Sequence, residues 1–156
     1  MVSRIVVSNA TPLVALAWLE QLDLIPKLFG SAHIPQAVYD EFQHNPEAVG
    51  ATELDAVPWL RISSVQDSLA VSLLLDQLDL GESEAIVLAR ELQANLLLMD
   101  ERRGRRRAVQ AGLNVVGTLG ILVQARRQNL IGPLRQLLDR LQQLPFHMSE
   151  RLYQDV

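Results

Sequence analysis

Short apolar runs alternate with longer segments of helical periodicity along most of this chain. Runs that are brief, continuous and rich in β-branched residues or leucine are typical of strands buried on both faces. The predicted strands are residues 4–8, 32–34, 95–99 and 113–116, with an extended patch near 59–62. The predicted helices are residues 12–19, 22–29, 35–43, 47–56, 66–77, 82–93, 102–112, 118–128 and 133–143. Strands that alternate with helices predict a three-layer α/β/α fold with a central parallel sheet of four to five strands.

Capping residues, proline and glycine predict where several of these elements begin and end. Thr11 and Pro12 predict the start of the first helix, with a hydroxyl N-cap followed by proline in the first turn. Gly112 ends the arginine-rich helix, and Gly117 separates the last predicted strand from the next helix. No repeat, low-complexity tract or linker interrupts the chain, so we expect residues 1–156 to form a single domain.

Length and composition narrow the class of protein. A chain of 156 residues with 49% hydrophobic and 21% charged residues can bury a full core and is not a disordered tail. The absence of cysteine excludes disulfides, thiol catalysis and cysteine-type zinc sites. No apolar run reaches the roughly 18 residues of a membrane span. We therefore expect a soluble cytoplasmic protein without a membrane partner.

Charge is distributed unevenly along the sequence. Residues 1–99 hold 4 basic and 13 acidic residues, a net charge of −9, whereas residues 100–140 hold 9 arginines and 3 acids, a net charge of +6. Such asymmetry within one domain predicts an acidic cluster beside a basic rim. The rim would steer an anionic substrate toward a cation that the acids hold.

Two polar residues stand directly after predicted strands. Asn9 follows the first strand and Asp100 follows the third. Ligands of open parallel sheets bind outside the carboxyl ends of the strands, so these two side chains would face one rim if their strands are neighbours.

Helical geometry selects the other candidate acids. At 100° per residue, Glu41 lies at the edge of the buried stripe of its helix, and Glu82 shares a row with Ile86. Glu84 lies off that row and is better placed for water. We expect Glu41 and Glu82 to be held inward, with Glu84 as the reserve.

Each of these residues also has a purely structural interpretation. Glu82 would then be only a partner of the helix dipole, Glu41 a solvated flank, Asp100 a helix cap and Asn9 a turn residue. The functional interpretation rests on convergence of four oxygen-bearing side chains at one rim. Carboxylates that crowd together repel unless a cation neutralises them, and oxygen ligands without histidine or cysteine suit Mg²⁺ or Mn²⁺.

Other common site chemistries have no pattern in the sequence. His33, His44 and His147 lie in separate elements without the spacing of a zinc site. The G-x-S-x-G elbow of hydrolases and both glycine-rich phosphate loops are absent.

Five arginines follow Asp100 closely. They are Arg102, Arg103, Arg105, Arg106 and Arg107. A run of this kind is usually a solvated helix face. Its position next to a candidate metal ligand favours contacts to phosphate, which arginine binds with two parallel hydrogen bonds.

Four segments together resemble the PIN-domain family, and more narrowly its VapC-like toxin branch. They read V-V-S-N-A-T-P-L-V-A-L, I-P-Q-A-V-Y-D-E-F, L-G-E-S-E-A-I-V-L-A and L-L-L-M-D-E-R-R-G-R-R-R-A-V-Q-A-G-L-N-V-V-G-T-L-G-I-L. The resemblance covers nearly the whole chain in the expected order and is weakest over about residues 45–75.

This resemblance implies a Mg²⁺- or Mn²⁺-dependent ribonuclease whose acidic positions correspond to Asn9, Glu41, Glu82 (or Glu84) and Asp100. Asn9 is a departure, since most PIN nucleases have aspartate there, although asparagine is frequent in the narrower branch. Asparagine can offer a carbonyl oxygen but no charge, so metal binding should be weaker.

The resemblance also implies contacts to RNA and to proteins. Thr11, close to the first acidic position, would bind the RNA substrate, and Arg102, Arg103, Arg105 and Arg106 would position it. A VapC-like chain would be inhibited by a small antitoxin protein, often through a basic side chain inserted into the site, and would commonly form a homodimer. The leucine-rich helix 66–77 and the apolar stripe 130–144 are candidate partner surfaces, with core packing the favoured role for both.

Two other functions compete with the ribonuclease. A catalytically silent PIN fold that binds RNA or a protein is motivated by Asn9. A phosphoacceptor signalling domain would need an acid pair after the first strand and a lysine late in the chain, yet Lys27 is the single lysine.

Overall fold

Five parallel strands form the centre of the structure, a computed structural model that describes residues 4–44 and 57–144. The strands are β1 (Val6–Ser8), β2 (Ala32–Pro35), β3 (Leu60–Ser63), β4 (Leu96–Leu98) and β5 (Val115–Val116). Their order in the sheet is β3-β2-β1-β4-β5, and every neighbouring pair is parallel. The predicted α/β architecture is confirmed, and the extended patch near residues 59–62 is the fifth strand.

Helices occupy the segments that the periodicity predicted. They are α1 (Ala10–Trp18), α2 (Leu24–Phe29), α3 (Gln36–His44), α5 (Ser68–Leu74), α6 (Leu80–Glu91), α7 (Arg102–Gln110), α8 (Thr118–Arg127) and α9 (Leu134–Leu141). The helix predicted over residues 47–56 lies outside the described residues. None of the helices in the two described ranges has the length and apolar content of a membrane span.

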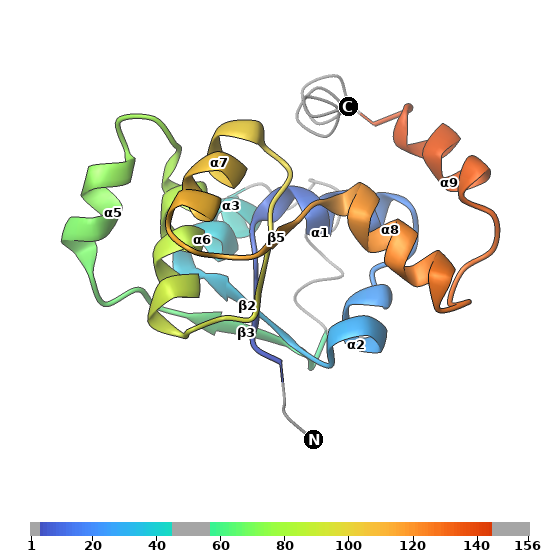
Figure 1. The fold of residues 1–156 in the computed structure, drawn as a ribbon, viewed down its shortest axis with the longest axis horizontal. Coiled ribbons are helices and arrows are strands. Elements are labelled where there is room, and N and C mark those ends of the chain that lie inside the picture. The colour runs from blue at the N-terminus through green and yellow to red at the C-terminus, as the bar shows by residue number, and fades with distance from the viewer. Residues whose placement is uncertain (1–3, 45–56, 145–156) are drawn as a thin grey trace.

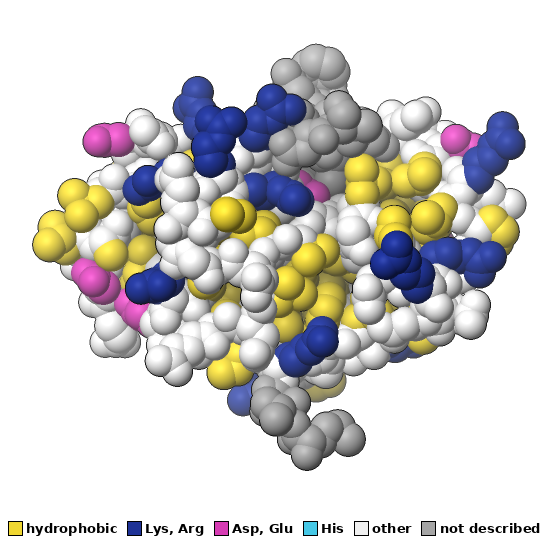
Figure 2. Space-filling view, viewed as in Figure 1, with side chains coloured by type: hydrophobic (Ala, Val, Ile, Leu, Met, Phe, Trp, Pro, Cys, Tyr) yellow, Lys and Arg dark blue, Asp and Glu magenta, His cyan; other side chains and the backbone are white. Residues whose placement is uncertain are grey.

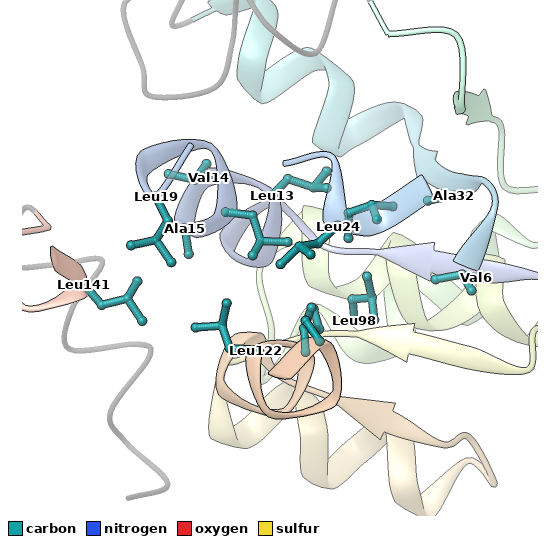
Figure 3. Packing of buried hydrophobic residues seen from close by; sticks show 14 of the residues in the cluster. Val6, Leu13, Val14, Ala15, Leu19, Leu24, Ala32, Leu98, Leu122 and Leu141 are labelled. Carbon is teal, nitrogen blue, oxygen red and sulfur yellow. The ribbon is translucent and has the colours of Figure 1, made fainter. Parts of the chain in front are cut away.

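Side chains that alternate along the strands divide the core between the two faces of the sheet. Val6 and Leu98 join an apolar cluster with residues of α1, α2 and α8, whereas Val7 and Leu97 join a second cluster with residues of α6 and Ala108 of α7. Figure 1 shows α5, α6 and α7 on one side and α1, α2, α8 and α9 on the other. In Figure 3, side chains of α1 point toward Leu122 and Leu98. Both faces of the sheet are therefore covered, as its continuous apolar strands require.

Helices α1 and α6 begin earlier in the sequence than predicted. The N-cap of α1 is Asn9, in extended conformation, because its N–H still donates to Leu98 O of β4 at 2.9 Å. Pro12 is then the third helical residue, where a missing N–H costs nothing since the first turn has no partners for its N–H groups. Helix α6 begins at Leu80 because Asp79 and Glu82 form a reciprocal capping box.

The C-terminal apolar stripe packs into the core. Leu141 is fully buried, and Leu130, Leu134, Leu137 and Leu138 pack against the same cluster. Trp18 Nε1 donates to Arg140 O at 2.8 Å and Arg140 Nη2 donates to Trp18 O at 3.0 Å, which joins α9 to α1. The favoured role of this stripe, core packing, is confirmed.

Candidate functional site

The strand order reverses between β1 and β4. From β1 the chain passes to β2 on one side, and the later strands β4 and β5 lie on the other side. Such a reversal leaves a crevice at the carboxyl ends of the two central strands. Asn9 and Asp100 follow these strands, and Ser8 is in register with Leu98. The prediction that these two residues face one rim is confirmed.

Asp100 is buried and held by hydrogen bonds from α8. Thr118 N donates to Asp100 Oδ1 and Thr118 Oγ1 donates to Asp100 Oδ2, both at 2.7 Å. The cap of α7 is Glu101 instead, whose Oε2 accepts from Gly104 N at 2.7 Å. Asp100 is therefore not the helix cap that the structural alternative required. Its carboxylate is fixed at the crevice by a residue from the next strand–helix connection.

Asn9 lies at the same edge with its side chain unused by the helix. It is 4% exposed and occupies the N-cap position of α1, yet it makes no side-chain capping hydrogen bond. Thr11, the second residue of the same helix, is also buried. The burial of Thr11 favours a positioning role over direct contact with a large substrate.

Glu82 is the most unusual carboxyl group of the site. It is 6% exposed, and its Oε1 accepts from Asp79 N at 3.1 Å within the capping box. Its Oε2 is buried and accepts no hydrogen bond from the described residues. Burial raises the pKa of Glu82 to about 8, and the nearby carboxylates of Asp79 and Glu101 act in the same direction, against the hydrogen bond from the backbone of Asp79. A buried anion with an unsatisfied oxygen is costly unless a proton or cation reaches it.

Glu101 lies beside Glu82, although the sequence pattern did not predict it among the candidate residues. Its side chain lies next to that of Glu82 and raises the pKa of Glu82 both by charge and by direct side-chain interaction. A Cβ atom added to Gly104 would lie 3.4 Å from Glu82 Oε2 and 3.5 Å from Glu101 Oε2. The available signal was its place beside Asp100, directly after a central strand.

Glu41 and Glu84 depart from their predicted positions. Glu41 is exposed rather than held inward, although its side chain reaches α6: a Cβ atom on Gly81 would lie 2.5 Å from Glu41 Oε1. Glu84 does not point freely into water, because its Oε1 accepts from Ala37 N at 2.9 Å, at the first turn of α3. One oxygen of Glu84 thus serves to join the two helices.

The expected single cage of carboxylates is not formed. In the part of the chain that the structure describes, no three His, Asp or Glu side chains form a group that could hold a metal ion. Glu82 and Asp100 accept hydrogen bonds from different residues, Asp79 and Thr118 respectively.

The arginines of α7 face different surroundings. Arg102, Arg103 and Arg106 are exposed, and Figure 2 shows basic side chains gathered over α7. Arg105 is half-buried and turned toward the crevice: a Cβ atom on Gly117 would lie 2.7 Å from both Arg105 Nη1 and Asp100 Oδ1. Arg107 lines a separate groove of about 530 Å³ between α5, α6 and α7. The run is thus a solvated face only in part.

A family model described as "PIN domain" (DUF3368) matches residues 5–156. The chain belongs to this family of PIN domains. The match covers the sheet, both helical layers and every residue considered above. No curated protein matches the chain in sequence.

PIN domains are generally nucleases and typically bind divalent metal ions. The donor atoms at this crevice fit such an ion in chemistry, since all are carboxylate or amide oxygens, the ligands that Mg²⁺ and Mn²⁺ prefer. The unsatisfied buried oxygen of Glu82 fits it as well.

Proposed function

We propose that this PIN domain is a Mg²⁺- or Mn²⁺-dependent endoribonuclease of the VapC-like branch and the toxin of a VapBC-type toxin–antitoxin pair. The observation that carries the proposal is the buried carboxylate oxygen of Glu82, which has no donor among the described residues, beside the crevice between β1 and β4. Buried oxygens without a donor are rare in folded proteins, and a bound cation would satisfy this one.

Four side chains of the chain would bind the cation. Asp100, oriented by Thr118, and Glu82, through Oε2, would hold the cation, with the amide oxygen of Asn9 as a neutral ligand. Glu41, whose carboxylate reaches Gly81, would complete the set through water. When bound, the cation polarises the phosphate and lowers the pKa of a water molecule.

The basic rim would bind the substrate. Exposed Arg102, Arg103 and Arg106 are suited to successive phosphates of a single RNA strand, and Arg105 to a phosphate close to Asp100. Such contacts are independent of base sequence and weaken with salt.

The proposed protein partners are a small antitoxin and a second copy of the chain. Helix α5 supports such contacts, because Leu69 and Leu73 are 68% and 69% exposed. Large apolar side chains exposed together on one short helix are typical of interaction surfaces.

Cleavage of a single-stranded RNA in the presence of Mn²⁺ tests the enzymatic proposal. We expect cleavage that EDTA abolishes and that Glu41→Gln or Asp100→Asn removes. Cleavage that persists in EDTA would refute the metal-dependent mechanism. Expression of the chain in a bacterium tests the toxin role: we expect growth arrest that co-expression of a short neighbouring reading frame relieves.

A catalytically silent RNA- or protein-binding module is the second candidate. It is favoured by the uncharged Asn9 and because no three acidic or histidine side chains in the described ranges form a group that could hold a metal ion. Asn9→Asp distinguishes the two: if it creates cleavage where the natural chain has none, the natural chain is the silent form.

A further inference from the structure

A second cavity lies on the side of the sheet that α2 and α8 cover. Its volume is about 300 Å³, at the lower end of the range of small-molecule sites. Two of its lining residues are Arg4, which precedes β1, and Leu96, which begins β4. The cavity therefore lies toward the amino ends of the central strands, whereas Asn9 and Asp100 follow their carboxyl ends. A ligand in this cavity would be separate from one bound at the crevice.

Most of the lining of this cavity is apolar. It comes from Leu96 of β4, Val116 of β5, Ile121 of α8, and Leu28 and Phe29 of α2. Ile121 is fully buried, whereas the other four are only half-buried and pack against the same apolar cluster. Figure 2 shows hydrophobic side chains at the surface between β5 and α8. A cavity with this lining favours a ligand with apolar faces.

Gly120 of α8 lines the cavity without a side chain. A Cβ atom there would lie 2.9 Å from Val116 Cγ1, so a larger residue would displace Val116 or α8. Glycine inside a helix is less favourable than alanine by about 1 kcal/mol. The close approach of α8 to β5 that forms this part of the cavity therefore depends on a residue that the helix itself does not favour.

Three polar side chains also line the cavity, and all three are exposed. They belong to Arg4, Gln124 and Gln128. None of them makes a side-chain hydrogen bond or an ion pair with residues 4–44 or 57–144. Among the described residues, no acidic side chain lines the cavity, so its charge is positive.

These groups select the chemical class of the ligand. A glutamine amide offers donors and an acceptor in one plane, which matches the edge of a nucleobase such as adenine. A guanidinium binds phosphate oxygens with two parallel hydrogen bonds. A fatty acid would use Arg4 and the apolar lining but would leave both glutamines without a partner.

A nucleotide uses all three features, because it combines flat apolar faces, an edge of donors and acceptors, and an anion. We propose that this cavity is a nucleotide-binding site, with the base between residues of α2 and α8 and the phosphate at Arg4. Gln124 and Gln128 would bind the edge of the base.

Titration of the intact chain with AMP, GMP, CMP and UMP in EDTA, followed by nuclear magnetic resonance, tests this site. We expect at least one of the four to shift the backbone amide signal of Gly120 and the side-chain amide signals of Gln124 and Gln128. EDTA keeps divalent ions from binding nucleotides at the crevice. Shifts confined to α7, or no shift with any of the four, would overturn the proposal.

Two variants separate the contacts to the phosphate from those to the base. Arg4→Gln should weaken binding of the nucleoside monophosphate about 10-fold and leave binding of the matching nucleoside unchanged. Gln124→Leu should weaken both ligands about 5- to 10-fold. The control is Arg135→Gln, which alters an exposed arginine on α9 and should bind both ligands as the natural chain does. Equal affinities in all three variants and the natural chain would contradict the assignment.

A free nucleotide and a nucleotide within an RNA strand share this chemistry, and competition distinguishes them. If a short single-stranded RNA displaces the bound nucleotide and itself binds more weakly to Gln124→Leu, the cavity takes part of an RNA strand. If the nucleotide remains bound in the presence of that RNA, the cavity is a site for a free nucleotide.

Decanoate tests the competing ligand, an amphipathic carboxylate. Binding of decanoate in the cavity without binding of any of the four nucleotides would make the proposal wrong. The site does not depend on the proposed nuclease: a chain that binds the nucleotide at Gly120 but cleaves no RNA would keep it. A chain that cleaves RNA but binds no nucleotide there would lose this inference alone.

Discussion

The two sides of the crevice hold their carboxylates in opposite ways. On one side, Asp100 accepts two hydrogen bonds of 2.7 Å from Thr118. On the other side, Glu82 is equally buried but leaves Oε2 without a donor in the described ranges, with Glu101 beside it. The carboxylate of Asp100 is satisfied within the fold, whereas that of Glu82 is stabilised only when a proton or a cation reaches it.

The two carboxyl groups therefore affect the stability of the fold in opposite ways. A carboxylate already oriented by Thr118 needs little rearrangement to bind a cation. Glu82 instead destabilises the fold when ionised, and a bound cation would recover that free energy. Function-related sites commonly keep such unfavourable groups at the expense of stability.

The largest expected effect on RNA cleavage comes from replacing Asp100, the carboxylate that Thr118 holds. Asp100→Asn should lower the rate of RNA cleavage by at least about 100-fold, because the amide removes a ligand charge from the site. Initial rates with a short single-stranded RNA and saturating Mn²⁺ measure it. Asp139→Asn, an exposed acid on α9, is the control and should retain full activity. Equal rates in the two variants would remove Asp100 from the active site.

The pH dependence of stability tests the buried carboxyl group of Glu82, whose Oε2 has no donor among the described residues. The pKa of Glu82 is raised from 4.5 to about 8 in the folded chain, so between these values the folded state retains a proton that the unfolded state loses. Stability from this group is therefore present below pH 4.5 and is lost as the pH rises toward 8. In EDTA, Glu82→Gln should remove this fall and be more stable at pH 8 by a few kcal/mol, to order of magnitude. Urea unfolding from pH 5 to 9 measures it.

A matched surface variant checks that interpretation. Glu20→Gln removes an exposed carboxylate and should leave the profile unchanged. A Glu82→Gln profile that falls as steeply as that of the natural chain would show that other groups cause the pH dependence.

Thr118→Val would leave Asp100, like Glu82, with a buried oxygen that lacks this donor. The variant removes the hydroxyl that donates to Asp100 Oδ2 and leaves the backbone donor in place. We expect a loss of about 1–3 kcal/mol in the free energy of unfolding, because a buried acceptor loses its partner. Thr118→Ser keeps the donor and should lose less. If valine and serine are equally stable in chemical denaturation, the hydroxyl bond does not hold Asp100.

The smallest expected effect concerns RNA binding by the arginines of α7. Arg103 is exposed on α7, whereas Arg107 lines the groove beside α5 and donates to Gln110 Oε1 at 3.0 Å. Arg103→Gln should weaken RNA binding a few-fold and lower the slope of log affinity against log salt by about 0.7. Arg107→Gln should change neither. Fluorescence anisotropy at several salt concentrations measures both, and equal slopes would contradict binding along the exposed face.

Much of this architecture was predictable because local patterns and tertiary packing agree. The continuous apolar run at residues 95–99 became β4, since a strand between two others has both faces covered. The row shared by Glu82 and Ile86 correctly predicted that Glu82 is buried. Helix starts were less accurate, because Asn9 still pairs with β4 through its backbone when α1 begins.

The errors concern side chains whose partners are distant in sequence. Glu84 accepts from Ala37, which lies 47 residues earlier, and no pattern within α6 reveals that bond. Glu101 was overlooked because its significance depends on Glu82 across the packed helices. Glu41 was expected to be inward from its helix alone, although the neighbouring helix decides how far it is covered.

The sequence by itself determined the layered fold, the two polar residues at the carboxyl ends of β1 and β4, and the basic character of α7. These features follow from periodicity, strand length and local charge, which are properties of adjacent residues. Only the tertiary structure decided which carboxylates are satisfied and which are left facing one another. That outcome depends on the approach of helices from distant parts of the chain, and a shift of an ångström there determines whether a buried oxygen finds a donor.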